Sequence, residues 1–397
     1  MGRSLMILVV FAISIIPGFG TEPKFRIVPI DQVETSNNTV TCTVFQSDDD
    51  FFLYTAGDGN KIDVFQIARN GELQFLTSNV VTGGRNTVRG LVADKIAGKN
   101  FLFAGLKGGN AVEVFEIYDD GTLHSVFVEH DNEATHLGIV ITLQVVHMQS
   151  ASYLFVGGLE KTPGLSAFRI TQDGKLEHVQ SMADTEEIFT DGIIGMSVHS
   201  IDGKTYLFTG GFQDNGLSSF RVFEDGHFEV ISNIGDDSNL FLNGTYPVIS
   251  STKSSRHYVV VGHRHHIYYK PTPWIKDRDT YFYHGDAVSV FRVDEKGKLL
   301  PRSVFLGDST NLIKGQTRLH KLPLDEKFDL VAVGTRDDQS IQLCLLNETG
   351  RLIDAGKIRT GFPIYYGLCG QKIDDQLFLF AGSVEGKELA SYRLDLE

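Results

Sequence analysis

The sequence is poor in the motifs that mark common enzyme classes. It contains no Gly-x-Ser-x-Gly elbow, no glycine-rich phosphate loop in front of a helix, no zinc-ligand spacing and no EF-hand loop. Helical periodicity is almost absent along its 397 residues. The sequence therefore gives no motif for a serine hydrolase, a P-loop enzyme, a zinc site or an EF-hand, and its glycines belong to turns.

Positive charge is also in the minority. The chain has 36 lysines and arginines against 50 aspartates and glutamates, which gives a net charge of −14. This field would repel a phosphate backbone, so we expect no nucleic-acid partner. The one long apolar run, residues 5–16, is too short and too close to the N-terminus to cross a bilayer, so we expect no membrane span.

The first 20 residues have the pattern of a secretory signal peptide. Arg3 supplies the positive charge, residues 5–16 form the apolar segment, and small residues up to Gly20 suit a signal peptidase. We therefore expect that residues 1–20 are removed, that residues 21–397 form one domain, and that the protein is secreted and extracellular. Three glycosylation sequons agree with export: Asn37, Asn243 and Asn347.

What the chain does contain is one pattern repeated seven times. Each copy has five residues that start with a large apolar side chain and end in glycine. The seven glycines are Gly57, Gly105, Gly157, Gly210, Gly262, Gly334 and Gly382. Successive glycines are 48, 52, 53, 52, 72 and 48 residues apart. A period near 50 in β-rich units is typical of a propeller, so we predict an all-β, seven-bladed β-propeller.

The fourth repeat shows how a blade is built. Residues 193–200 and 206–210 are apolar runs, and residues 217–222 and 227–231 alternate apolar and polar side chains, a pattern that predicts four strands. An Asp-Gly turn that ends at Gly226 separates the last two, since glycine supplies the positive φ of a tight hairpin. The repeat therefore predicts four-stranded antiparallel blades.

The two ends of the chain predict how the ring closes. The seventh repeat stops at Glu397 after its third strand, and residues 25–28 resemble the fourth strand of other repeats. We therefore expect the N-terminal strand to close the last blade, which would remove a free sheet edge.

The three cysteines have different expected roles. Cys344 replaces the aromatic residue of other repeats, which predicts a buried free thiol. Cys42 and Cys369 fall on the innermost strands of the first and last blades, which ring closure makes neighbours. The two alternatives for this pair are a disulfide, formed in an oxidising compartment, and two unpaired core thiols.

Polar residues near the start of the innermost strands are candidates for a ligand site. Arg318 and His320 are two apart, so on a strand they face the same side, toward the expected channel mouth. Arginines would suit an anionic small molecule, and histidines could exchange protons near neutral pH. The alternative is that these residues pair with acidic residues of adjacent blades. The catalytic candidates are Arg89, Arg318, His320 and His136, with Thr142 and Tyr366 as further lining residues.

One repeat carries an insertion. Between Gly262 and Phe291 there are 29 positions, against 8 to 11 in the other repeats. Long loops often bind ligands, and aromatic with polar side chains suit a small organic ligand. The alternatives are a metal held by histidines, and a flap packed on its own blade. The ligand-binding candidates in the insertion, residues 263–286, are His263, His265, His266, Tyr268, Trp274, Tyr283 and His284.

Four loops that precede innermost strands begin with Asp and end with Gly. They span residues 131–138, 184–192, 236–244 and 308–315. Their carboxylates either form a rim for a cation or polar ligand, or cap their own turns through local hydrogen bonds. The second interpretation is favoured, because a residue repeated in a repeated loop is usually structural.

The paired signatures, such as residues 206–210 followed by 219–226, resemble those of the lactonase-type seven-bladed propellers, which include bacterial 6-phosphogluconolactonases and fungal carboxymuconate cyclases. The resemblance runs from residue 24 to residue 397 and consists of blade-building residues, so no catalytic residue is carried over. It implies a ligand site at the channel mouth and either lactone hydrolysis or lactone formation.

Two functions are therefore compatible with the sequence. One is a secreted lactonase-like propeller that acts on, or binds, a small organic acid or lactone at the channel mouth. The other is a non-catalytic secreted binding protein for a pigment, a glycan or a protein partner on the same scaffold, since a fold does not decide a function. In either case we expect a monomer with no cofactor and no metal.

Overall fold

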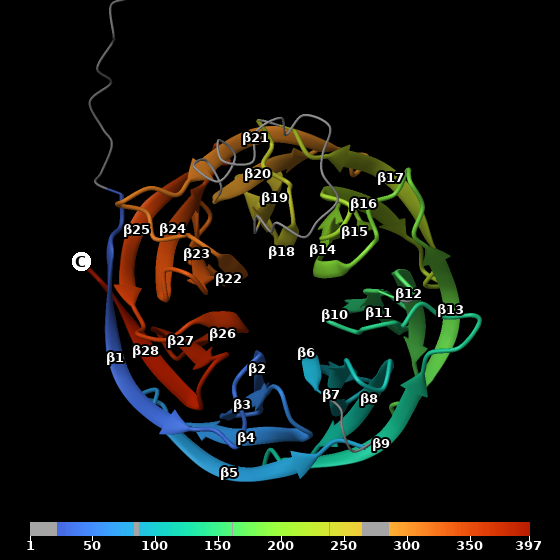
Figure 1. The fold of residues 1–397 in the computed structure, drawn as a ribbon, viewed down its shortest axis with the longest axis horizontal. Helices are drawn as coiled ribbons and strands as arrows, with labels where there is room; N and C mark the ends of the chain where they lie inside the picture. Colours follow the sequence, from blue (N-terminus) through green and yellow to red (C-terminus); the bar gives the residue numbers. More distant parts are fainter. Residues whose placement is uncertain (1–21, 83–86, 161, 238, 264–285) are drawn as a thin grey trace, which may run out of the picture.

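The computed structural model describes residues 22–82, 87–160, 162–237, 239–263 and 286–397. Within these ranges every long regular element is a β-strand, and the sheets are arranged radially in a ring (Figure 1). The predicted all-β propeller with four-stranded antiparallel blades is confirmed. In the described part of the chain, no helix has the length and apolar character needed to cross a membrane.

Five sheets contain four strands each, and each sheet takes its strands from one stretch of the chain. The first strand of each lies innermost in the ring and the fourth lies outermost (Figure 1). The strands are β6 (Val88–Ile96), β7 (Lys99–Leu106), β8 (Ala111–Ile117), β9 (Leu123–His130); β10 (Thr142–His147), β11 (Ser152–Gly158), β12 (Gly164–Ile170), β13 (Leu176–Ala183); β14 (Ile193–Ile201), β15 (Lys204–Gly211), β16 (Gly216–Val222), β17 (Phe228–Gly235); β18 (Thr245–Lys253), β19 (Arg256–His263), β20 (Ala287–Val293), β21 (Leu299–Leu306); β22 (Gln316–Pro323), β23 (Phe328–Thr335), β24 (Ser340–Asn347) and β25 (Leu352–Arg359).

Eight further strands form one sheet in the order β1-β28-β27-β26-β2-β3-β4-β5. Its two halves meet at a single parallel pair, Thr41 with Tyr366. The predicted count of seven blades depends on dividing this sheet at that pair. The strands are β1 (Phe25–Glu34), β2 (Thr41–Ser47), β3 (Asp50–Ala56), β4 (Lys61–Ile67), β5 (Leu73–Val80), β26 (Ile364–Ile373), β27 (Gln376–Ser383) and β28 (Glu388–Leu396).

The N-terminal strand closes the ring, as the sequence predicts. β1 pairs antiparallel with β28, from Phe25 opposite Leu396 to Glu34 opposite Glu388. The strand is longer than the predicted residues 25–28, and a bulge interrupts its register after Pro29. Its buried side chains Phe25 and Ile27 join an apolar cluster with residues of β24, β27 and β28. Ring closure therefore combines a hydrogen-bonded ladder with apolar burial.

The repeated aromatic residue and the repeated turn glycine pack against each other between neighbouring blades. Gly226 has a φ of 83°, and a Cβ added to it would lie 2.3 Å from the ring of Tyr153 in the preceding sheet. The Tyr153 hydroxyl also donates a hydrogen bond to the Glu224 carbonyl in that turn (2.9 Å). Only glycine fits both demands. The same contact joins Phe101 with Gly174, Tyr206 with Gly297, Tyr258 with Gly350, and Phe378 with Gly71.

Candidate functional site

Two cavities lie at the centre of the ring. The channel cavity has a volume of about 230 Å³ and is lined by residues of the innermost strands β2, β6, β10, β14, β18, β22 and β26. The mouth cavity, about 260 Å³, is lined mainly by loops at the ends of these blades, including Asp58, Lys107, Glu160 and Arg336. Arg89, Ile141 and Tyr366 line both cavities, so the two spaces are adjacent.

Most candidates from the innermost strands face the channel cavity. Arg318 and His320 line it, as do Arg89, Thr142 and Tyr366. Each side chain comes from a different blade, apart from the first two, which share β22. The fold therefore gathers residues that are more than 200 positions apart in the sequence at one place.

The channel cavity is lined by positive charge only. Arg89, Arg318 and Lys321 line it, together with His320, and its described lining includes no aspartate and no glutamate. Hydroxyl groups complete the polar part of the wall: Thr41, Thr43, Thr142 and Ser197. In a protein with a net charge of −14 this local excess of cations is a concentrated field for an anion.

The three cations are held differently. Arg89 forms an ion pair with Asp58 across the cavity edge (2.9 Å), which agrees with the expected alternative of pairing with an adjacent blade. Arg318 donates only a long hydrogen bond, from Nε to the Leu368 carbonyl (3.4 Å), and has no ion pair within the described ranges. Lys321 donates to the Ser250 carbonyl of β18 (2.6 Å). Burial lowers the pKa of this ammonium group.

His320 is kept neutral by its surroundings. Its Nε2 lies 3.1 Å from the Gly370 carbonyl on β26, and since a carbonyl can only accept, Nε2 carries the proton. Burial, assisted by the charge of Arg318, lowers the pKa of His320 to about 4. The ring is therefore uncharged at neutral pH, with Nδ1 as its proton-accepting nitrogen.

The low pKa of His320 predicts a loss of stability in acid. The unfolded chain protonates this ring near pH 6.5 and the folded chain near pH 4, so between these values the unfolded state binds more protons. Lowering the pH from 6.5 to 4 should therefore cost up to roughly 3 kcal/mol from this group alone. His320→Gln should remove that part of the slope in denaturant titrations at several pH values. The exposed His130→Gln should leave the slope as in the wild type.

A cluster of tyrosines lies beside the two cavities. The rings of Tyr246 and Tyr366 are stacked, with centroids 5.2 Å apart, and Tyr365 packs edge-on against Tyr366 at 4.4 Å. Burial and the neighbouring hydroxyls raise the pKa of Tyr366 well above its usual value. Tyr366 therefore stays a neutral donor, and this tyrosine cluster gives the cationic cavity an aromatic wall.

Other predicted site residues lie elsewhere. His136 packs against Gly158 and Gly164 and lines neither central cavity, which does not support its predicted role at the channel mouth. His263 is fully buried at the end of β19, with its ring 5.9 Å from that of Phe241. The remaining candidates of the insertion, and the predicted signal peptide at residues 1–20, lie outside the described residues: His265, His266, Tyr268, Trp274, Tyr283 and His284.

The cysteine pair lies where the ring closes, on β2 and β26. The Sγ atoms of Cys42 and Cys369 are 2.9 Å apart, which is longer than the bond of a disulfide, about 2.05 Å. The structure therefore holds this pair as two free thiols, the second of the two predicted alternatives. Cys344 is a buried free thiol, as predicted.

The sequons differ in accessibility. Asn243 is 2% exposed, and Nδ2 of Asn37 is buried. An attached glycan needs an accessible amide nitrogen, so the structure does not support the predicted glycosylation of these two residues. Asn347 is partly exposed and caps a turn, where its Oδ1 accepts hydrogen bonds from Thr349 and Arg351.

The aspartates that begin the four related loops cap their own turns, in agreement with the favoured interpretation. Asp131 accepts from the backbone N–H of Leu137 (2.9 Å), and Asp236 from that of Leu242 (2.6 Å). Asp184 and Asp308 accept from Thr190 and Thr310 in the same way. Asp184 also lies close to Asp191 and Asp214, and burial in this acidic group raises the pKa of Asp214 to about 7.

Two residues of this region were not among the candidates predicted from the sequence. Lys321 adjoins His320 and lines the cavity although neighbouring strand residues point to opposite faces, because its long side chain reaches across to β18. Tyr246 is fully buried behind the wall, where its ring stacks on that of Tyr366. The position of Tyr246 at the start of an innermost strand, the criterion that selected Arg318, could have identified it.

Comparisons with known proteins identify the fold of this chain and do not identify its family. No protein-family model and no curated protein sequence matches this chain. Among solved structures the chain is similar to the crystal structure of Raptor from Chaetomium thermophilum, a protein that contains a β-propeller, with a TM-score of 0.58 and 12% identity. The match covers 94% of this chain and 30% of Raptor. The fold therefore places this chain in the class of β-propeller proteins.

Proposed function

We propose that this chain is an exported β-propeller that binds a small organic acid, as its carboxylate anion or as the corresponding neutral lactone, in the channel cavity. The observation that supports this most directly is the charge of the lining: Arg89, Arg318 and Lys321 without a carboxylate among the described lining residues. Arg89 is paired with Asp58, whereas Arg318 is partly buried and has no ion pair in the described chain, so an anionic ligand would offset the cost of its desolvation. The predicted signal peptide supports export.

Arg318 is the residue best placed to hold the anion. Within the described chain only Nε of this guanidinium has a protein acceptor, and that contact is long, so its other N–H groups are available to a ligand. A planar guanidinium binds a carboxylate through two parallel hydrogen bonds. The cavity volume of about 230 Å³ suits a compact acid, and the stacked Tyr366 ring offers an apolar surface for its carbon skeleton.

The resemblance to lactonase-type propellers makes lactone hydrolysis the second candidate, with the neutral ring of His320 as the candidate proton acceptor. A water oxygen would bond to the lactone carbonyl carbon while Nδ1 of the neutral imidazole takes its proton. Arg318 would stabilise the resulting oxyanion. The ring C–O bond would then break, and the proton would pass from the imidazole to the leaving alkoxide. Net change is one water added and one hydroxy acid formed.

The test uses short mono- and dicarboxylic acids and five- and six-membered lactones as probes. Titration calorimetry should detect binding of at least one acid to the wild-type protein, and Arg318→Met should weaken it about 10- to 100-fold, as expected for a charge-assisted contact. Arg169→Met, an exposed arginine of β12, is the control and should bind as the wild type. Lactone opening is measured in a pH-stat through the acid that it releases. If the site is catalytic, this activity should be lost in His320→Gln.

The outcomes separate the possibilities. Binding that is lost in Arg318→Met, without any turnover, would assign a binding protein. Turnover that persists in both variants would show that the chemistry occurs elsewhere. Absence of binding for every acid and lactone, or equal affinity in Arg318→Met, would refute the proposed anion site.

A further inference from the structure

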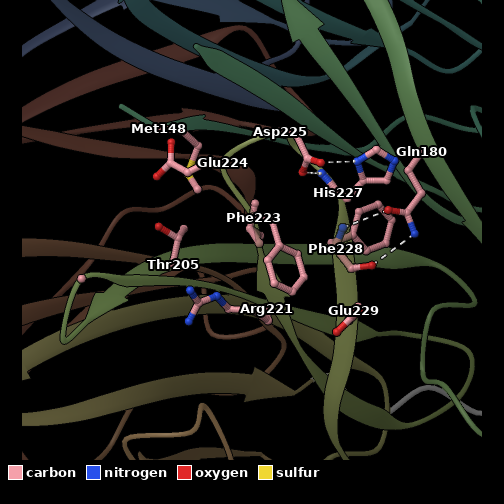
Figure 2. Close-up of a pocket in the computed structure, with 12 residues that line it drawn as sticks. Met148, Gln180, Thr205, Arg221, Phe223, Glu224, Asp225, His227, Phe228 and Glu229 are labelled. Atoms are coloured by element: carbon pink, nitrogen blue, oxygen red, sulfur yellow. Dashed lines mark hydrogen bonds and ion pairs between the residues drawn. The ribbon is translucent and has the colours of Figure 1, made fainter. Parts of the chain in front are cut away.

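A third cavity, larger than the two central ones, is separate from the central site. This blade-edge pocket has a volume of about 790 Å³ and lies at the turns that join β14 to β15 and β16 to β17, with Met148 and Gln180 contributed by the preceding sheet (Figure 2). Its lining has no residue in common with the channel cavity or the mouth cavity as described. Its size is that of a ligand site.

An arginine stacked on two aromatic rings lies in this pocket. The guanidinium carbon of Arg221 is 5.4 Å from the centre of the Tyr206 ring and 5.7 Å from that of Phe223. Nε of Arg221 is buried without a hydrogen-bond partner, and no ion pair of this residue is found within the described ranges. Rings on its faces leave the edge of the guanidinium, with its N–H groups, as the part that can bind.

The preceding blade contains the same strand pair in its ordinary arrangement. Arg169 lies opposite Glu177 in register, and the two form an exposed ion pair (3.7 Å). Arg221 lies opposite Glu229 in the equivalent register, but here the arginine stacks on the rings instead. The difference follows from one position, since Phe223 occupies the place of Thr171 and offers a ring two residues along the same face.

The other polar groups of the pocket already have partners. Asp225 pairs with His227 (3.1 Å), and Gln180 bonds through both ends of its amide to the backbone of Phe228. Glu224 accepts a hydrogen bond from the backbone of Gln149 (3.0 Å). Figure 2 shows the first two of these interactions and, in the same view, Thr205, Arg221 and Glu229 around the Phe223 ring without a drawn contact. Within the described chain these three groups have no hydrogen-bond partner.

We propose that the blade-edge pocket binds a neutral oligosaccharide. The available groups are a donor in Arg221, an acceptor in Glu229 and a hydroxyl in Thr205, which together suit a ligand whose hydroxyls both donate and accept. Phe223 is 37% exposed, a high value for a phenylalanine, and its face suits the C–H surface of a sugar ring.

The charges of the lining exclude the neighbouring ligand classes. Arg221 is the single cation against Glu224, Asp225 and Glu229 in the described lining, so an anionic ligand would be repelled. A purely apolar ligand would bury Arg221 and Glu229 without partners, which is unfavourable.

The experiment applies the labelled full chain to an array of neutral and sialylated oligosaccharides, followed by calorimetry with each neutral oligosaccharide that binds. The wild type should bind at least one neutral class, and Phe223→Ala and Arg221→Ala should each reduce its affinity 10-fold or more. Arg169→Ala and Thr171→Ala alter the equivalent positions of the preceding blade and should bind as the wild type. Glu229→Gln, which keeps an acceptor oxygen, should lose less affinity than Glu229→Ala.

Folding and the central site are controlled separately. Because Phe223 lies at the surface, Phe223→Ala should still unfold cooperatively and keep the wild-type circular dichroism spectrum, and Arg318→Met should leave oligosaccharide binding unchanged. Failure of the anion proposal would therefore not affect this one. The oligosaccharide proposal would be overturned by an array without neutral binders, by binding confined to sialylated sugars, or by equal affinities of Phe223→Ala, Arg221→Ala and the wild type.

Discussion

Ile27→Asp should cost the protein several kcal/mol of stability. The substituted residue lies near the N-terminus, whereas β28, the strand it pairs with, lies near the C-terminus. Ile27 is 8% exposed and lies opposite Leu394, within the apolar cluster that β1 shares with β24, β27 and β28. The change loses the burial of the side chain, about 1.5–3 kcal/mol, and places a carboxylate in an apolar site at further cost. The expected total is about 3–5 kcal/mol in urea unfolding followed by circular dichroism.

The adjacent Arg26 provides the matched control. It lies on the same strand with its side chain 67% exposed, and it pairs with Asp395 at the surface (3.1 Å). Arg26→Ala removes only that exposed ion pair and should cost less than about 1 kcal/mol. Deletion of β1 as a whole would expose the edge of β28 and should abolish cooperative unfolding and promote aggregation. Similar small losses for Ile27→Asp and Arg26→Ala would show that strand β1 does not hold the ring together.

The repeat made most of the fold predictable, because each signature is local and the contacts that it makes are the same in each blade. The pair Tyr153 and Gly226 illustrates this, since the aromatic residue and the turn glycine meet between adjacent blades in five places. The length of β1 was not predictable in the same way. Residues 29–34 follow β28 after a bulge at Pro29, and they have no apolar alternation that would mark a strand.

For the candidate site, the sequence could predict only which residues of one strand share a side. The spacing of Arg318 and His320 predicted a shared side, and both line the channel cavity. The ion pair of Arg89 with Asp58 joins strand β6 to a loop of another blade, and no spacing within one repeat contains that information. Cys42 and Cys369 are a second case that the sequence could not decide. Closure of the ring predicts that their strands are neighbours, but the distance between the Sγ atoms depends on how the two strands are rotated.

The blade-edge pocket was not predictable from the repeat, and the reason is specific. Arg169 and Arg221 occupy the same position in the repeat and the same register opposite a glutamate. Their side chains differ because one repeat has Thr171 where the other has Phe223. A repeat is recognised by what its copies share, whereas this candidate site depends on a residue in which two copies differ.

Lys253→Met should be among the most destabilising single substitutions in this protein, because it would leave Asp329 charged and buried. Lys253 on β18 and Asp329 on β23 join neighbouring sheets through an ion pair of 2.6 Å whose side chains are only 6% and 3% exposed. The ammonium group also donates to the carbonyls of Asp325 and Phe328, and Ser251 donates to the Asp329 carboxylate. Removal of one partner of such a pair typically costs about 3–5 kcal/mol.

The chain contains a pair with the same chemistry at its surface. Arg69 and Asp374 approach as closely (2.7 Å), but their side chains are 53% and 67% exposed, so Arg69→Met should cost less than about 1 kcal/mol. The double variant Lys253→Met with Asp329→Leu should regain most of the stability lost in Lys253→Met, since two apolar side chains carry no buried charge. Urea titrations of the wild type and the three variants measure each difference. If Lys253→Met were as mild as Arg69→Met, water would have to reach Asp329, and the contact between these two blades would be looser than its buried ion pair implies.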